Sequence, residues 1–286
     1  MNSESDQPAQ EAQFPSHPDL AHAGKHAATL ALHAYRSDRG FVPTEKEPTG
    51  TVTFLEIDGK TYAVTAAHVV RILNKAANEY GMPEGSFIVP KAPGVSISGP
   101  FLTPPKDVAA RLPPDIGLRP IHPELPNHVG KTAFVVREDN CAPETITHGH
   151  AVGFPTFCKA DVSDNQGVYS AMQCVHAIAE FVSESVDQLN FRSQIDDFPK
   201  TGSLSGMSGG PVFWSDEGNY GLTGIVIEAI DAAPEESLFN VPMVQFIAQR
   251  VDYHTLRAWA AYADEHWQKA RDELNAKIRA EQSIFN

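Results

Sequence analysis

Three short segments of this sequence carry residue types that could together perform nucleophilic hydrolysis. They read TAAH, ending at His68, DIGL, beginning at Asp115, and GMSGGP, around Ser208. A serine hydroxyl attacks a carbonyl carbon when a base takes its proton, an acid holds that base in one tautomer, and donors stabilise the oxyanion. Ser208, His68 and Asp115 are therefore the candidate nucleophile, base and acid.

The glycines around Ser208 allow two interpretations. The stretch 202–211, GSLSGMSGGP, could be a flexible linker, or it could be a sharply bent backbone that holds one hydroxyl in a reactive place. To form an oxyanion hole, the N–H groups of Gly206 and Ser208 must point the same way, which calls for a turn that side chains would obstruct. Flexibility would defeat that purpose, so the catalytic interpretation predicts a fixed turn.

Each segment alone is a weak signal, and other residues compete for the same roles. Asp107 is an alternative acid, but Asp115 leads the apolar run IGL, whereas charge and two prolines follow the segment after Asp107. His148 and His150 would share one face of a strand and could bind a metal, yet no acid or cysteine stands at ligand spacing. We expect ordinary strand histidines there, and no metal site. The three segments together, in this order and in a β-rich chain, favour a Ser–His–Asp site.

Most of the chain is predicted to form short antiparallel strands. Asp58–Gly59 joins two alternating runs and indicates a hairpin that ends near His68, after which a helical stretch runs to about Gly81. Short β-like runs separated by turn residues then continue to about residue 250, with a natural division at 121–130. The expected fold class is all-β, either an antiparallel barrel or a sandwich.

The two ends of the chain differ from this pattern. Residues 1–27 are polar and without period, which predicts a disordered arm. From residue 253 onward the sequence has no Pro or Gly until its end, and apolar residues recur at steps of three or four between Ala260 and Ile278, which predicts an amphipathic helix. This helix could dock on the barrel or bind a regulatory protein. The predicted domains are residues 1–27 (arm), 28–125 and 126–250 (β-units) and 251–286 (helix).

Composition argues against several classes of partner. The 36 acidic and 22 basic residues give a formal charge of -14, which would repel nucleic acid and anionic lipid, so we expect neither nucleic acid nor membrane as a partner. The first residues lack a basic start and an apolar run, which predicts a cytoplasmic protein. Cys141, Cys158 and Cys174 are widely spaced, and we expect reduced thiols and neither disulfides nor zinc.

The motifs TAAH, DIGL and GMSGGP, in the order His, Asp, Ser, resemble the three signatures of the chymotrypsin/trypsin-like serine peptidases. The resemblance covers roughly residues 28 to 250 and implies a double antiparallel β-barrel with His68 and Asp115 in the first barrel and Ser208 in the second. It implies that Ser208 is the nucleophile, His68 the general base and then acid, and Asp115 the orienting carboxylate, with Gly206 and Ser208 as oxyanion donors. It also implies protein or peptide substrates and no cofactor. The chain order excludes an α/β-hydrolase.

Two positions depart from the digestive branch of that family. Met207 stands where that branch has an aspartate that pairs with a new N-terminus, so the sequence looks more like the bacterial trypsin-like branch. We expect control by a partner or by loop rearrangement. No acid stands at Gly202, where the trypsin pattern has one, so a preference for Arg or Lys is not supported.

The family pattern places the pocket for the residue before the scissile bond between two segments. They contribute Gly202 and Leu204 on one side and Ile227 and Ala229 on the other; Glu228 could face inward or outward. A weak preference for a small or medium apolar residue follows. Two alternatives to an endopeptidase remain open at this point: a catalytically silent relative that binds proteins, and an esterase.

Overall fold

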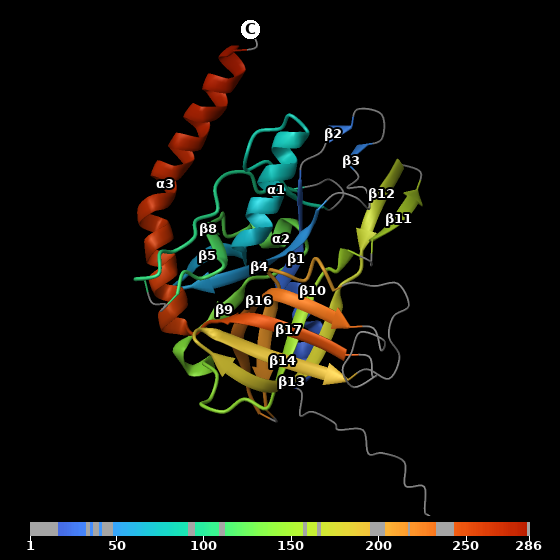
Figure 1. The fold of residues 1–286 in the computed structure, drawn as a ribbon, viewed down its shortest axis with the longest axis vertical. Helices are drawn as coiled ribbons and strands as arrows, with labels where there is room; N and C mark the ends of the chain where they lie inside the picture. Colours follow the sequence, from blue (N-terminus) through green and yellow to red (C-terminus); the bar gives the residue numbers. More distant parts are fainter. Residues whose placement is uncertain are drawn as a thin grey trace, which may run out of the picture.

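The computed structural model describes most of the chain. The described residues are 17–32, 35–36, 40–41, 48–90, 95–108, 112–156, 159–164, 167–194, 204–216, 218–232 and 243–284. Residues 1–16 of the predicted arm lie outside this set. Two β-units are stacked along the long axis of the molecule, and a long C-terminal helix lies beside the first of them (Figure 1).

The first β-unit is an open sheet in the order β7-β6-β1-β4-β5-β8, and β9 pairs in parallel with β4. The bounds are β1 Ala27–Leu32, β4 Gly50–Ile57, β5 Lys60–Ala66, β6 Phe87–Val89, β7 Val95–Ser96, β8 Ile116–Pro120 and β9 Phe134–Val136. A two-stranded ribbon is formed by β2 (Tyr35–Arg36) and β3 (Gly40–Phe41). The helices attached to this unit are α1 (Ala67–Glu79) and α2 (Leu125–His128).

The second β-unit is a closed six-stranded barrel in the order β10-β13-β14-β17-β16-β15. The bounds are β10 His148–Gly153, β13 Val175–Ser185, β14 Gln188–Gln194, β15 Pro211–Ser215, β16 Tyr220–Ala232 and β17 Met243–Arg250. A separate ribbon contains β11 (Lys159–Asp164) and β12 (Gly167–Met172), and a short 3-10 helix η2 spans Glu138–Asn140. The structure confirms the predicted fold class: mostly antiparallel β-structure in two units, the first a half-barrel, with a long C-terminal helix.

Local sequence accounts for the hairpin that leads to the site. Asp58 and Gly59 both have positive φ, 50° and 76°, as a two-residue turn that matches strand twist requires. The turn joins β4 to β5, whose residues are almost all buried. The chain then enters α1 directly after Ala66, so the predicted hairpin ends where expected and His68 lies in the first turn of α1.

The hydrophobic core has three parts. One fills the first sheet under α1, one fills the barrel, and the largest lies between the two units and the start of the C-terminal helix. Phe134 of β9 and Phe213 of β15 make an edge-to-face contact across this shared core, with ring centroids 5.2 Å apart. The two units therefore share one continuous apolar interface.

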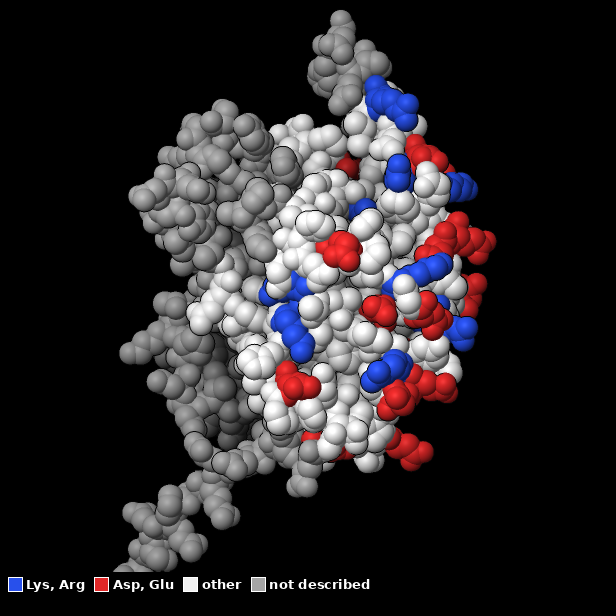
Figure 2. Space-filling model, turned by 180° about the vertical axis from the view of Figure 1, so that it is seen from behind, with Lys and Arg blue, Asp and Glu red and all other residues white. Residues whose placement is uncertain are grey.

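The predicted C-terminal helix is α3 (Tyr253–Ile284). Its first half docks on the first unit through side chains that are fully or nearly fully buried: Leu256, Trp259, Ala260 and Ala263. Asp264 accepts hydrogen bonds from Lys60 and from Tyr62 of β5. The second half extends beyond the body (Figure 1), and its outer side carries interspersed acidic and basic side chains (Figure 2). Among the described residues, no helix has the length and apolar character to cross a membrane.

Two predicted boundaries differ from the structure. Residues Pro18–His26 form a 3-10 helix, η1, in place of the last part of the predicted arm. Leu20, Ala23 and His26 are buried because a helix with three residues per turn places them on one side, against the shared core. The first unit also extends past residue 125, since β9 adds to β4.

Candidate active site

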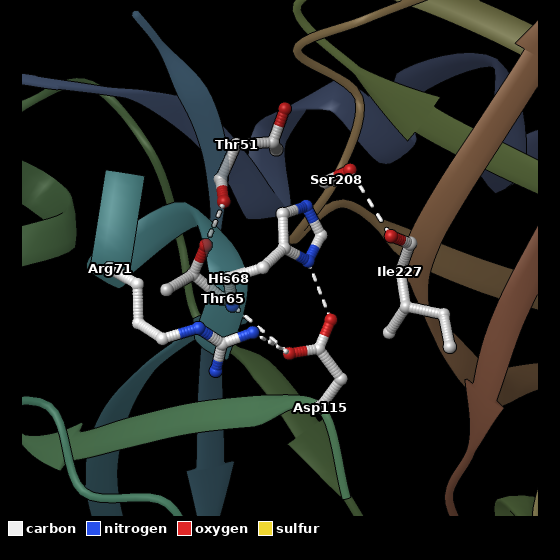
Figure 3. A network of polar contacts seen from close by, with 7 residues as sticks. All are labelled: Thr51, Thr65, His68, Arg71, Asp115, Ser208 and Ile227. Carbon is white, nitrogen blue, oxygen red and sulfur yellow. Dashed lines mark hydrogen bonds and ion pairs between the residues drawn. The ribbon is translucent and has the colours of Figure 1, made fainter. Parts of the chain in front are cut away.

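His68 and Asp115 meet where β5, α1 and β8 converge. Asp115 immediately precedes β8, which pairs with β5, and His68 is the second residue of α1. Nδ1 of His68 lies 2.5 Å from Oδ2 of Asp115, and the backbone N–H of His68 donates to Oδ1 at 3.0 Å (Figure 3). The two side chains are equally exposed, at 29%. Asp107, the alternative acid, is exposed and has no contact with His68 among the described residues.

Asp115 also replaces the missing cap of α1. Ala66 at the N-cap offers no side-chain hydrogen bond, and the N–H groups of Ala67 and His68 donate instead to the backbone oxygen and the carboxylate of Asp115. Burial would raise the pKa of Asp115, but the hydrogen bonds and charge of His68, assisted by Arg71, bring that pKa below its usual value. An ionised carboxylate accepts only, so Nδ1 of His68 donates and Nε2 is left as the acceptor of a proton.

The turn that carries Ser208 is bent and fixed. Gly206 and Gly209 have positive φ, 104° and 93°, and a Cβ added at Gly209 would lie 2.0 Å from the backbone oxygen of Thr51. Glycine is thus required there by conformation and by space. Among the described residues, the N–H groups of Gly206 and Ser208 donate no hydrogen bond, whereas those of Met207, Gly209 and Gly210 donate to backbone oxygens.

Two threonines of β4 fasten this turn to the first unit. Oγ1 of Thr51 donates to the oxygen of Gly206 at 2.8 Å, and Oγ1 of Thr53 donates to the oxygen of Gly209 at 2.7 Å. The N–H of Thr51 also donates to the oxygen of Ser208 at 2.9 Å. Both threonines are fully buried. We call Thr51 and Thr53 the threonine clamp; sequence reasoning missed it, because threonine in a strand is common and gives no local signal.

The threonine clamp is itself held in place. Oγ1 of Thr65, three residues before His68, donates to the oxygen of Thr51 at 2.7 Å (Figure 3), and the N–H of Phe154 donates to Oγ1 of Thr51 at 3.1 Å. The hydroxyl of Thr51 therefore both donates and accepts, which fixes its direction. The segment that carries His68 and the turn that carries Ser208 are connected through one residue.

Ser208 lies on the side of His68 opposite Asp115. In Figure 3 the ring nitrogen of His68 that does not contact Asp115 faces the hydroxyl of Ser208. That hydroxyl donates a long hydrogen bond, 3.4 Å, to the backbone oxygen of Ile227. Ile227 is the extra residue at a register shift in β16, between Val226 and Glu228. Such a bulge next to a site commonly redirects one backbone group.

A pocket of about 70 Å³ connects His68 and Ser208. Its apolar wall comes from α1, through Val69, Ile72 and Leu73, and Ser205 and Gly206 line its other side. Among the described residues predicted to form the specificity pocket, Leu204, Ile227 and Ala229, none lines it. Leu204 is 7% exposed and instead packs in the barrel core with Met207.

The other predicted pocket residues are placed as follows. Ile227 and Ala229 are half-buried on β16, and Glu228 between them is exposed. Gly202 lies outside the described residues. Met207, the position of the family aspartate, is fully buried in the barrel core, and a Cβ at Gly153 would lie 3.0 Å from its side chain.

His148 and His150 are buried in β10 and contact other polar side chains. His148 lies 2.9 Å from Oγ1 of Thr147 and 3.2 Å from Oγ of Ser215, and His150 lies 2.8 Å from Nδ1 of His176. Burial, with the nearby histidines, lowers the pKa of His150 to about 4. Within the described part of the chain, no group of three His, Cys, Asp or Glu side chains is arranged to hold a metal ion.

Comparison with known proteins finds similarity at the level of structure alone. No family profile matches the chain, and no curated protein matches its sequence. Solved structures that resemble it include a thermostable serine protease, AL20, from an extremophilic microorganism, with 11% identity, 84% of this chain and 98% of that chain covered, and a TM-score of 0.46. The protease Anisep from Arthrobacter nicotinovorans has 12% identity, coverages of 84% and 96%, and a TM-score of 0.46.

A third similar structure is a scabies mite inactivated protease paralogue, with 12% identity, coverages of 84% and 94%, and a TM-score of 0.43. These structure neighbours thus include two proteins named as proteases and one named as an inactivated protease paralogue.

Proposed function

We propose that this protein is a serine endopeptidase that hydrolyses peptide bonds of protein substrates through an acyl-enzyme. The observation that carries the proposal is the pairing of His68 with Asp115 at 2.5 Å while the other ring nitrogen faces Ser208. This order of acid, base and hydroxyl is what nucleophilic catalysis by serine requires. The bacterial trypsin-like branch is the family assignment that we propose.

In this mechanism Oγ of Ser208 attacks the peptide carbonyl carbon, and its proton passes to Nε2 of His68. The imidazolium, stabilised by the low-pKa carboxylate of Asp115, then protonates the leaving amine as the C–N bond breaks. Water attacks the acyl-enzyme in the second half, with His68 again as base, and the acid product leaves. The chemistry needs no metal or organic cofactor.

The free N–H groups of Gly206 and Ser208 support an oxyanion hole. Both belong to the bent turn, and neither donates to a described group, so both are available to the developing negative charge. Removing one such donor in a serine peptidase typically lowers kcat by about 10²–10³. The threonine clamp fixes the backbone that carries them.

Specificity is proposed from the pocket between His68 and Ser208. Its small volume and its apolar wall of Val69, Ile72 and Leu73 suit a small apolar substrate side chain next to the scissile bond. Exposed Glu228 argues against a role for that carboxylate in holding a basic side chain.

One observation favours a second candidate, a catalytically silent protein that uses the same cleft to bind proteins. The hydroxyl of Ser208 donates to Ile227 and makes no hydrogen bond to His68 among the described contacts. Activity requires a rotation of this side chain toward His68. Catalytic hydrogen bonds often form only with substrate bound, which is why the active candidate is preferred.

Labelling with a fluorophosphonate probe tests the proposal. We expect the wild-type protein to be labelled at Ser208, and Ser208→Ala to lose both labelling and hydrolysis of a casein-type substrate. His68→Ala should lose them as well. Labelling of Ser208→Ala at the wild-type rate would refute the nucleophile, and a wild type that folds but is not labelled would favour the silent candidate. Faster turnover of small acyl esters than of peptides would identify an esterase.

We further propose that a regulatory protein contacts the outer half of α3, because the inner half is already buried. Removing residues 278–286 keeps buried Trp259, the contacts of Trp267 and the ion pair of Lys277 with Glu84, so we expect an unchanged melting temperature. Casein hydrolysis that differs between the full chain and this truncation in cell extract, but not with purified protein, supports such a partner. Equal activity in both settings contradicts it.

A further inference from the structure

Arg119 is a buried cation without a matching anion in the described part of the chain. It lies on β8 with 7% of its surface exposed. Among the described residues it donates one hydrogen bond, from Nη1 to the backbone oxygen of Ile97, and its Nε is inaccessible and has no acceptor. A guanidinium has five N–H donors, and buried charges in proteins are usually paired.

The neighbours of Arg119 offer little compensation for this charge. The guanidinium carbon lies 5.7 Å from the ring centroid of Phe101 and 5.3 Å from that of Trp267, so two aromatic rings attract it weakly. No described carboxylate forms an ion pair with it, and another cation, Arg271, acts on its charge. Burial and Arg271 lower the pKa of Arg119 to about 10, which still leaves it charged at neutral pH.

The backbone around the guanidinium makes room for it. Gly99 has φ 120°, and a Cβ added there would lie 3.2 Å from Nη1 and 3.4 Å from Nη2 of Arg119. The indole N–H of Trp267 donates to the oxygen of Pro100 at 3.1 Å, which holds that ring beside the guanidinium. The position of Arg119 is therefore fixed by the loop at 97–101 and by α3.

Arg119 lines an open pocket of about 430 Å³ between the end of β8, the loop after β7 and α3. The polar groups that accompany it are Ser96, Ser98 and His122. The rest of the lining is mainly apolar: Ile97, Pro120, Ile121, Leu125 and Trp267. A cation at one place in an apolar wall is the complement of an anion that carries an apolar chain.

We propose that this pocket binds a carboxylate on an apolar chain, with the carboxylate at Arg119 and the chain against Ile121, Leu125 and Trp267. A planar guanidinium matches the two oxygens of a carboxylate. A phosphate would gain nothing from the apolar wall. Such a carboxylate belongs to a free acid or to the C-terminus of a peptide, and both present the same chemistry to Arg119. The pocket shares no described lining residue with the His68–Ser208 pocket, so this site does not depend on the proposed peptidase activity.

Isothermal titration of the full chain with matched probes tests this site. Sodium hexanoate should bind at least tenfold more tightly than hexanamide, which lacks the charge, and than acetate or inorganic phosphate, which lack the chain. N-acetyl-Leu-Leu compared with its C-terminal amide forms a second arm; selective binding of this acid identifies a peptide C-terminus, and selective binding of hexanoate identifies a free acid.

Arg119→Gln should lose the selectivity for hexanoate over hexanamide. Arg257→Gln, the same change at an arginine of α3 that pairs with Asp58 at 2.9 Å and does not line the pocket, should keep it. If Arg119→Gln fails to fold, Leu125→Trp, which fills the apolar side without touching the guanidinium, should abolish the rise in melting temperature that hexanoate gives the wild type. Equal binding of acid and amide, absence of binding of every acid at millimolar concentration, or unchanged selectivity in Arg119→Gln would overturn the proposal.

Discussion

The two halves of the candidate site are held in place in different ways. His68 and Asp115 contact each other directly, through side chains and through the first turn of α1, and both belong to the first β-unit. Ser208 sits on a turn of the second unit whose backbone oxygens are held by Thr51 and Thr53 of the first. The acid–base pair is thus a product of one unit, while the position of the hydroxyl depends on the contact between both.

This difference separates two kinds of damage. The pair of His68 and Asp115 can change its protonation state while the positions of its heavy atoms stay the same. The turn with Ser208 can shift while every reacting group is retained. Substitutions that are nearly isosteric can test each half alone.

The largest effect is expected from Asp115→Asn. The amide keeps an acceptor for the N–H of His68, but its NH₂ group would favour the wrong tautomer of the ring, and kcat should fall by about 10⁴. Steady-state hydrolysis of a casein-type substrate measures it, with unchanged circular dichroism as the check on folding.

Asp107→Asn is the matched control for Asp115→Asn, because Asp107 is exposed and Asp115 is the carboxylate that His68 contacts. It should retain wild-type kcat. A large loss in the control with a small loss in Asp115→Asn would reverse the assignment of the acid.

Acid should lower the free energy of unfolding through two buried histidines. Burial lowers the pKa of His26, which lies between the units, to about 4, and that of His150, in the barrel, to about 4. Because an unfolded histidine takes up its proton near pH 6.5, stability is intact above that pH and is lost as pH falls from 6.5 to 4, by on the order of 3 kcal/mol for each group. Urea unfolding at a series of pH values measures this loss.

A single substitution tests how much of that loss comes from His150 in the barrel. His150→Asn should flatten the pH dependence of the unfolding free energy, while exposed His254→Asn should leave it unchanged. An unaltered slope in His150→Asn would show that this histidine is protonated normally in the folded protein.

A smaller effect is expected from Thr51→Val. Valine keeps the shape but removes the donor to Gly206 and the acceptor for Phe154, so the turn can shift. We expect kcat to fall by about 10–100-fold with KM nearly unchanged, since misplacement by about 1 Å can have that effect. Fluorophosphonate labelling of Ser208 should slow by a similar factor.

Thr61→Val provides the control for Thr51→Val, because Thr61 is also a buried strand threonine, at 5% exposure, and has no contact with the turn. A matching loss of kcat in both variants would mean that Thr51 acts on stability alone and not on position.

Sequence patterns predicted the parts of the molecule that depend on local residue types. The Asp58–Gly59 turn, α1 and α3 formed where periodicity and turn chemistry placed them. The proximity of His68 and Asp115 was implied by the resemblance of TAAH, DIGL and GMSGGP to the serine peptidase signatures, and the two side chains are in contact. The 3-10 helix at Pro18–His26 also has a signal in the sequence: a proline at its start, and Leu20, Ala23 and His26 at every third position.

Other features depend on contacts between distant segments and had no local signal. Thr51 reads as an ordinary strand residue, and only the fold places it against Gly206. Arg119 ends the run IGLR and reads as a polar residue at a strand end; Trp267, far along the chain, covers it. Leu204 was expected to line a pocket and is buried, because its direction is set by the barrel and not by its neighbours in sequence.

Because of the threonine clamp, the position of Ser208 relative to His68 depends on the contact between the two units. A force or a partial unfolding event that separated the units by about 1 Å would stop the proposed hydrolysis before either unit lost its strands. The rate of the proposed hydrolysis would then report how closely the two units are in contact. A molecule damaged at this interface would lose activity before it unfolded.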